Sequence, residues 1–192
     1  MTKTVLFLPG FKEGIHSRDY RKLLQMIKGK GYDVKFIDVD WKHKTLTDWR
    51  DEFMKIYEKY DTKNTILAGF SFGSMIALTA AEIKNPAELW LFSLSPHFAE
   101  DLPKFRKTWL REDGKRRVED FSNYHFANIA PKIHCPVLLL MGEIEMRKYD
   151  RISDWRFHDA KNRLANCRAI VVPGAEHDVT DKRYIAKIEE NI

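Results

Sequence analysis

Residues 65–83 read Thr-Ile-Leu-Ala-Gly-Phe-Ser-Phe-Gly-Ser-Met-Ile-Ala-Leu-Thr-Ala-Ala-Glu-Ile, and this stretch indicates the fold class. Residues 65–68 form a short apolar run typical of a buried strand, and a helical pattern begins at Phe72 and continues until an Asn-Pro pair ends it. Residues 69–73, Gly-Phe-Ser-Phe-Gly, join the two. A strand that turns this tightly into a helix pushes the central side chain out above the sheet, with the helix amino terminus beneath it. The pattern therefore predicts a nucleophile at Ser71; a glycine-rich turn with an incidental serine is the alternative.

Similar apolar runs alternate with amphipathic segments along the whole chain. Most runs are continuous in apolar character, as in strands that are covered on both faces of a parallel sheet. The predicted strands are residues 4–8, 34–39, 65–68, 89–94, 136–141 and 169–172. The predicted helices include one ended by Gly29 and Gly31, one capped by Thr47, one from Phe72, one within 152–164 and one within 182–188. This alternation predicts an α/β fold with a six-stranded, mostly parallel sheet and helices on both faces.

The length of 192 residues fits a single domain over residues 1–192. One connection, residues 96–131, is longer than a crossover helix requires, so we expect a lid-like insertion there that covers the site. Its aromatic side chains either favour apolar acyl groups or only pack the insertion onto the body. These aromatic residues are Phe98, Phe105, Trp109, Phe121, Tyr124 and Phe126.

The charge pattern argues for an ordinary solvated surface. The chain has 33 Lys and Arg against 28 Asp and Glu, a formal net charge of +5, with the two signs interleaved. A basic module that binds nucleic acid is an alternative, but no zinc-finger spacing, Walker loop or RNP-like motif supports it. No apolar window approaches a membrane span, and the first residues do not resemble a signal peptide. With Cys135 and Cys167 interpreted as buried thiols, we expect a cytoplasmic protein without nucleic-acid partners.

Two further segments follow predicted strands at the carboxyl edge of the sheet, where open parallel sheets bind ligands. His177 lies in a glycine-containing loop after the last strand, and none of the other six histidines follows a strand in this way. A serine hydroxyl is a weak nucleophile at neutral pH, and an imidazole can take its proton during attack. Glu143 and Glu145 follow the strand at 136–141, and either carboxylate can orient the histidine.

The order Ser71, Glu145, His177 resembles the Ser…Asp/Glu…His order of the α/β-hydrolase family. Residues 142–145, Gly-Glu-Ile-Glu, match the family's Gly-x-x-Asp pattern, which implies that Glu145 is the acid. Residues 8–11, Leu-Pro-Gly-Phe, resemble the family's His-Gly-x loop, although proline stands where histidine is frequent. The resemblance implies an oxyanion hole formed by the backbone N–H groups of Phe11 and Phe72. It also matches the first strand of this chain to the strand that the family numbers third, which leaves a reduced six-stranded sheet.

The resemblance implies hydrolysis of small-molecule carboxylic esters through an acyl-serine intermediate, as in a serine carboxylesterase. The same kind of site also hydrolyses thioesters and amides, and the sequence does not separate these substrates from esters. No metal and no organic cofactor is implied, and the oligomeric state is left open. The alternative is a catalytically degenerate protein of the same fold that binds a ligand or partner without turnover.

Overall fold

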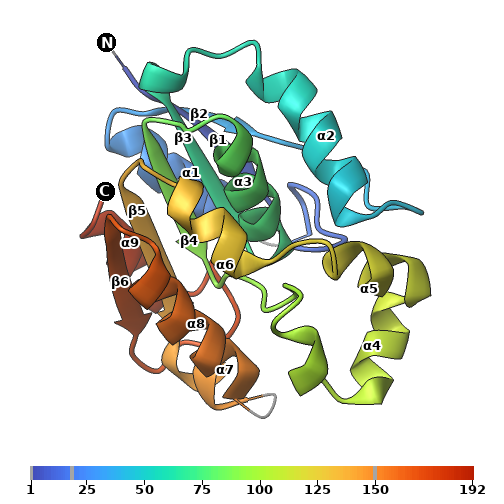
Figure 1. Cartoon of the computed structure of the whole chain (residues 1–192). Helices are drawn as coiled ribbons and strands as arrows, with labels where there is room; N and C mark the ends of the chain where they lie inside the picture. The colour runs from blue at the N-terminus through green and yellow to red at the C-terminus, as the bar shows by residue number, and fades with distance from the viewer. Residues whose placement is uncertain (1, 18–19, 149–150) are drawn as a thin grey trace.

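The computed structural model describes residues 2–17, 20–148 and 151–192. The six predicted apolar runs form one sheet in the order β2-β1-β3-β4-β5-β6 (Figure 1). All five neighbouring pairs are parallel, so the sheet is parallel throughout and not only mostly parallel. The strands are β1 (Thr4–Leu8), β2 (Asp33–Phe36), β3 (Thr65–Phe70), β4 (Glu88–Phe92), β5 (Val137–Gly142) and β6 (Cys167–Val172).

Helices cover both faces of this sheet, as predicted. In β1, Leu6 and Leu8 pack into one apolar layer and Val5 and Phe7 into the other. The first layer lies under α2, α3, α6 and α8, and the second under α1 and α9 (Figure 1). Burial on both faces explains why the strand sequences are continuously apolar. The longer helices are α1 (Tyr20–Gly29), α2 (Leu46–Tyr57), α3 (Phe72–Ile83), α8 (Ile152–Arg163) and α9 (Lys182–Glu189).

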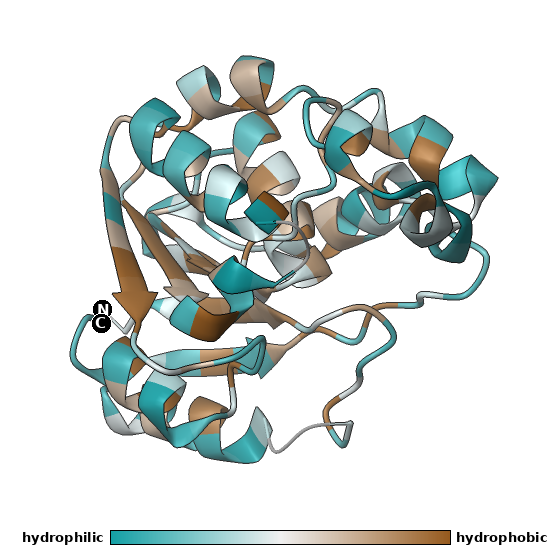
Figure 2. Cartoon of the chain, turned by 90° about the horizontal axis from the view of Figure 1, so that it is seen from below, coloured by the Kyte–Doolittle hydropathy of each residue, from teal (hydrophilic) through white to brown (hydrophobic). Residues whose placement is uncertain are grey.

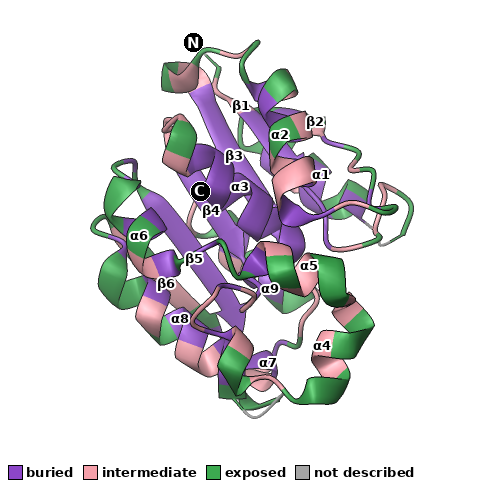
Figure 3. Cartoon of the chain, turned by 45° about the vertical axis from the view of Figure 1, so that its right-hand side comes forward, coloured by how far each residue is buried: buried purple, intermediate pink, exposed green. Residues whose placement is uncertain are grey.

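The burial and hydropathy of the elements agree with this layered arrangement. In Figure 3 the central strands are almost entirely buried, whereas the outer faces of the helices are exposed. Figure 2 shows apolar residues concentrated along the strands and polar residues over most of the surrounding helices. Within the described ranges, no helix combines the length and the apolar character needed to cross a membrane.

The cap of α2 differs from the prediction. Thr45, not Thr47, is the N-cap, and its side chain and that of Asp48 form a capping box with each other's backbone N–H groups. Thr47 lies in the first turn, where its hydroxyl donates to Asp120 Oδ1 at 2.6 Å. The prediction was wrong because two threonines precede the same apolar face, and only the reciprocal Asp48 contact distinguishes them.

The segment 96–131 folds into short helices that pack beside the carboxyl edge of the sheet. The segment is anchored to the body by a buried ion pair, in which Arg156 Nη2 of α8 lies 2.7 Å from Asp101 Oδ1. Phe98 and Phe126 lie against the Arg156 guanidinium, at 4.9 and 4.4 Å from their ring centres. Its elements are η2 (Leu102–Lys104), α4 (Lys107–Asp113), α5 (Lys115–Phe121), α6 (Phe126–Ile129) and η3 (Ala130–Lys132). Two further short elements are η1 (Thr62–Asn64) and α7 (Glu143–Arg147).

Candidate active site

Ser71 occupies a strained turn between β3 and α3. Its backbone has φ 56° and ψ −121°, a region that non-glycine residues rarely adopt. The flanking glycines permit the close packing around it, because a Cβ on Gly69 would lie 2.3 Å from the Gly73 carbonyl oxygen. A Cβ on Gly73 would lie equally close, at 2.3 Å, to the carbonyl oxygen of Leu8. The sequence therefore builds a turn that holds the Ser71 side chain at the carboxyl edge of the sheet.

Hydrogen bonds attach this turn to the neighbouring strand β4. The backbone N–H of Ser71 donates to the Phe92 carbonyl at 2.9 Å. The Ser74 hydroxyl lies 2.6 Å from the Gly69 carbonyl and 3.0 Å from that of Phe92. The surrounding structure thus compensates for the unfavourable φ of Ser71, as strained functional positions require.

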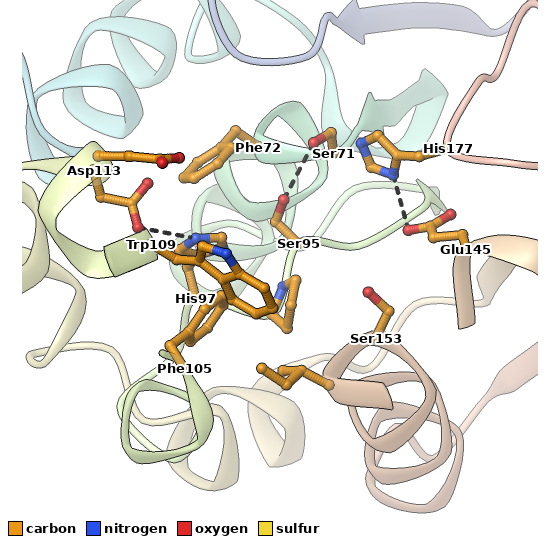
Figure 4. A pocket seen from close by; sticks show the side chains of 13 residues that line it. Ser71, Phe72, Ser95, His97, Phe105, Trp109, Asp113, Glu145, Ser153 and His177 are labelled. Carbon is orange, nitrogen blue, oxygen red and sulfur yellow. Dashed lines mark hydrogen bonds and ion pairs between the residues drawn. The ribbon is translucent and has the colours of Figure 1, made fainter. Parts of the chain in front are cut away.

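His177 and Glu145 are in direct contact. Glu145 Oε1 lies 2.8 Å from His177 Nδ1, and the glutamate is buried, with 3% of its surface exposed. Gly142 allows the two loops to meet, because a Cβ there would lie 2.5 Å from the Ala175 carbonyl oxygen. The N–H of Ile144 donates to that same oxygen at 2.9 Å. Figure 4 shows the imidazole between the Glu145 carboxylate and Ser71.

The other carboxylates near His177 have different partners. Glu143 accepts a hydrogen bond from the backbone N–H of Gly174 at 2.9 Å and is paired with Arg147. Glu176 forms an ion pair with Lys148 at 3.0 Å. Asp150, a further acid on this part of the chain, lies outside the described residues. Of the two candidates Glu143 and Glu145, only Glu145 therefore contacts the histidine.

Sequence reasoning missed two residues next to Glu145, of which Ser93 bonds to its second oxygen and Tyr184 lies beside Ser93. The Ser93 hydroxyl donates to Glu145 Oε2 at 2.7 Å, and Tyr184 Oη lies 2.9 Å from the Ser93 oxygen. Complete burial raises the pKa of the Tyr184 phenol well above its usual range, so it remains a neutral hydroxyl. Ser93 directly follows β4, and its place at the strand end was a signal that could have drawn attention to it.

In the described part of the chain, Ser71 Oγ has Ser95 Oγ as its hydrogen-bond partner, at 3.2 Å, and no bond joins it to His177. The His177 ring instead lies beside Ser71, with its centre 4.7 Å from that of Phe70. Catalytic hydrogen bonds are often long in unliganded sites and shorten when substrate binds. The three side chains thus lie in the order Ser71, His177, Glu145, and only the hydrogen bond between Ser71 and His177 is not formed.

The two backbone N–H groups expected to form an oxyanion hole are both available. Among the described residues, no atom accepts a hydrogen bond from the N–H of Phe11 or from that of Phe72. Phe72 is the first residue of α3, where helix geometry leaves the N–H without an internal acceptor. The two rings pack together with centres 5.3 Å apart, which places the loop after β1 against the start of α3.

A cavity of about 300 Å³ opens onto Ser71 and His177, and the insertion forms one of its walls. Phe105 and Trp109 of the segment 96–131 line it. Phe98 does not, because it is fully buried against Arg156 and Phe126. His97 also lines the cavity, although its position had not marked it as a candidate. Ser71 is buried, with 8% of its surface exposed, and it lines this cavity.

Neither cysteine is suited to act as a nucleophile. Cys135 and Cys167 are unpaired, and burial raises the pKa of each thiol to about 11, so both stay protonated at neutral pH. Across residues 2–17, 20–148 and 151–192, no three His, Cys, Asp or Glu side chains are grouped as metal ligands.

The sequence matches no protein-family model, and no curated protein shows significant sequence similarity to it. Solved structures are similar to the chain in three dimensions. Est1E from Butyrivibrio proteoclasticus, solved with ferulic acid bound, superposes with a TM-score of 0.81 at 16% identity, covering 98% of this chain and 85% of that one.

Two further structures show the same likeness. Alpha/beta hydrolase domain-containing protein 10 from mouse gives a TM-score of 0.76 at 16% identity, covering 98% of this chain and 87% of that one. A monoacylglycerol lipase from Paleococcus ferrophilus gives 0.72 at 19% identity, covering 98% and 94%. At this level of identity the likeness establishes the fold, and the predicted fold class is confirmed.

Proposed function

We propose that this chain, which has the α/β-hydrolase fold, is a serine hydrolase that cleaves carboxylic esters through an acyl-serine intermediate. The observation that carries the proposal is the joint placement of Ser71 in a strained turn, His177 beside it, and Glu145 at 2.8 Å from His177 Nδ1. A surface serine or a loop histidine alone has many structural explanations. A buried carboxylate that orients a histidine next to a strained serine has the geometry that nucleophilic catalysis needs.

In the proposed reaction, Ser71 Oγ attacks the ester carbonyl while His177 Nε2 takes its proton. Glu145 holds the tautomer with the proton on Nδ1 and stabilises the imidazolium that forms. The N–H groups of Phe11 and Phe72 stabilise the negative charge on the tetrahedral intermediate. His177 then protonates the leaving alcohol, and water, activated by the same histidine, releases the acid from Ser71.

The fold neighbours support ester substrates in particular. One is a monoacylglycerol lipase, and another, Est1E, was solved with ferulic acid bound. Thioesters and amides would use the same groups, and a comparison of matched ester, thioester and amide substrates tests this part of the proposal.

The proposal is tested by covalent labelling with a fluorophosphonate probe and by turnover of p-nitrophenyl acetate. Wild-type protein should be labelled, whereas Ser71→Ala should lose labelling and about 10⁴-fold or more in kcat. Ser95→Ala is the matched control, because Ser95 Oγ lies 3.2 Å from Ser71 Oγ but forms no hydrogen bond with His177 among the described residues; it should still be labelled. Labelling of Ser71→Ala at the wild-type rate would show that the nucleophile is another residue, and an unlabelled wild type would favour binding without turnover.

A further inference from the structure

Two carboxylates that the proposed reaction does not use line the cavity. Glu112 and Asp113 lie at the end of α4, on the wall formed by the insertion. Within the described residues, the charged side chains that line this cavity are Glu112, Asp113 and Glu145, and none is Lys or Arg. The chain as a whole carries a net charge of +5, so an acidic cavity does not follow from its average composition.

The negative charge of Asp113 is not neutralised by its neighbour His97. His97 Nε2 lies 3.3 Å from Asp113 Oδ2, and His97 Nδ1 is buried without any hydrogen-bond partner among the described residues. A proton on Nδ1 would therefore be a buried donor with no acceptor, which is costly. An imidazole with its proton on Nε2 donates that proton to Asp113 Oδ2 and needs no acceptor at Nδ1. In this arrangement His97 gives Asp113 a hydrogen bond.

Basic side chains on α5, which follows Asp113, pair with groups other than the two carboxylates. Lys115 is 3.6 Å from Glu119, and Arg116 Nη2 is 3.2 Å from Asp48. The Arg117 guanidinium donates to backbone carbonyls, those of Lys44 at 2.9 Å and of Asp113 at 3.2 Å. Glu112 is exposed and has no hydrogen bond or ion pair with any described residue. Among the described residues, neither carboxylate therefore forms an ion pair with a Lys or Arg side chain.

Aromatic rings form the wall between these carboxylates and Ser71. Phe72, Phe105 and Trp109 all line the cavity, and His97 packs between Phe72 and Phe105 at ring-centre distances of 4.6 and 4.8 Å (Figure 4). Aromatic faces together with carboxylates bind alkylammonium groups, because the ring quadrupole and the anionic charge both attract a cation. Arg106, which does not line the cavity, already lies 5.3 Å from the centre of the Trp109 ring.

We propose that the substrate of this site is an ester that carries an ammonium group, bound between the aromatic wall and the carboxylates Glu112 and Asp113. This inference rests on the proposed ester hydrolysis and specifies its substrate class. A purely apolar group would desolvate Asp113 without compensation, and an anionic group would be repelled by both carboxylates. A cation is attracted both by the negative charge of the carboxylates and by the faces of the aromatic rings.

The test compares pairs of esters that differ only in charge. One pair is butyrylcholine and the isostere in which carbon replaces its nitrogen, so that the charge lies in the alcohol. The other is the p-nitrophenyl ester of trimethylammoniobutyrate and its carbon isostere, so that the charge lies in the acyl chain. We expect kcat/KM to be about tenfold higher for the charged member of at least one pair, the scale of a cation held by rings and carboxylates.

The variant Glu112→Gln/Asp113→Asn keeps the shape and one acceptor oxygen on each side chain but removes both charges, so the charged-to-neutral ratio of kcat/KM should fall to within about threefold of one. Glu119→Gln, which removes the same kind of charge outside the cavity, should keep the wild-type ratio.

The inference is overturned if a protein labelled by fluorophosphonate shows no preference for the charged ester in either pair, or keeps its preference in the double variant. Wild type that is neither labelled nor active on any of the four esters would instead overturn the proposed function, and the inference with it.

Discussion

Ser93 offers a test of how the carboxylate of Glu145 is held. The residue is fully buried, adopts φ 50°, and donates to Glu145 Oε2 at 2.7 Å. Ser93→Ala removes this donor and leaves a buried carboxylate oxygen with one partner fewer. Ser93→Gly removes the same donor and also the Cβ, which is unfavourable at positive φ by about 1–2 kcal/mol.

The size of the effect follows from the character of this hydrogen bond. A bond from a hydroxyl to a buried carboxylate contributes about 1.5–3 kcal/mol. If the carboxylate loses this support when the imidazolium forms, kcat falls by about 10- to 150-fold. The upper limit is the loss on removing the acid altogether, about 10⁴-fold. KM should change little, because Ser93 does not line the cavity.

The assay is kcat and KM on p-nitrophenyl acetate, with the rate of fluorophosphonate labelling as a second readout and urea unfolding as the check on folding. Both Ser93 variants should lose similar amounts of kcat, although Ser93→Gly should be the more stable of the two. Tyr184→Phe should lose less, because it leaves the bond between Ser93 and Glu145 in place. A Ser93→Gly protein with kcat within twofold of wild type would refute this reasoning.

Glu145→Gln should keep the fold and lower kcat by up to about 10⁴-fold, because the amide no longer fixes the tautomer of His177. Glu143→Gln should cost less than about tenfold, and equal losses in the two variants would argue against Glu145 as the acid. Arg156→Met should lower the free energy of unfolding, measured in urea, by about 3–5 kcal/mol, because it leaves the buried Asp101 carboxylate without the positive charge of Arg156. Combining it with Asp101→Leu should restore most of that loss, and no recovery would indicate that packing alone is responsible.

Local patterns in the sequence were sufficient to predict the sheet and the turn that carries Ser71. Continuous apolar runs predict strands covered on both faces, and all six were found. Ser71 was predictable because the strand, the turn and the helix that position it are contiguous in the chain. The spacing from Gly142 to Glu145 also favoured Glu145 over Glu143 as the acid. That preference came from the resemblance to the family's Gly-x-x-Asp pattern and not from geometry.

Other features depend on contacts between residues far apart in the chain. Ser93 and Tyr184 are 91 residues apart, and their link to Glu145 exists only because β4, β5 and α9 meet at one edge of the sheet. The carboxylates of the cavity wall likewise meet the other lining residues only because α4 packs beside the cavity and brings Asp113 to His97.

The physical reason for this division is the range of the interactions. Strand and turn preferences act between near neighbours, so the sequence alone determined the α/β architecture and the strained turn at Ser71. Hydrogen bonds and charge contacts depend on distances of a few ångströms between side chains from different elements. Only the tertiary structure therefore decided what holds the Glu145 carboxylate, which aromatic rings line the cavity, and which carboxylates join them there.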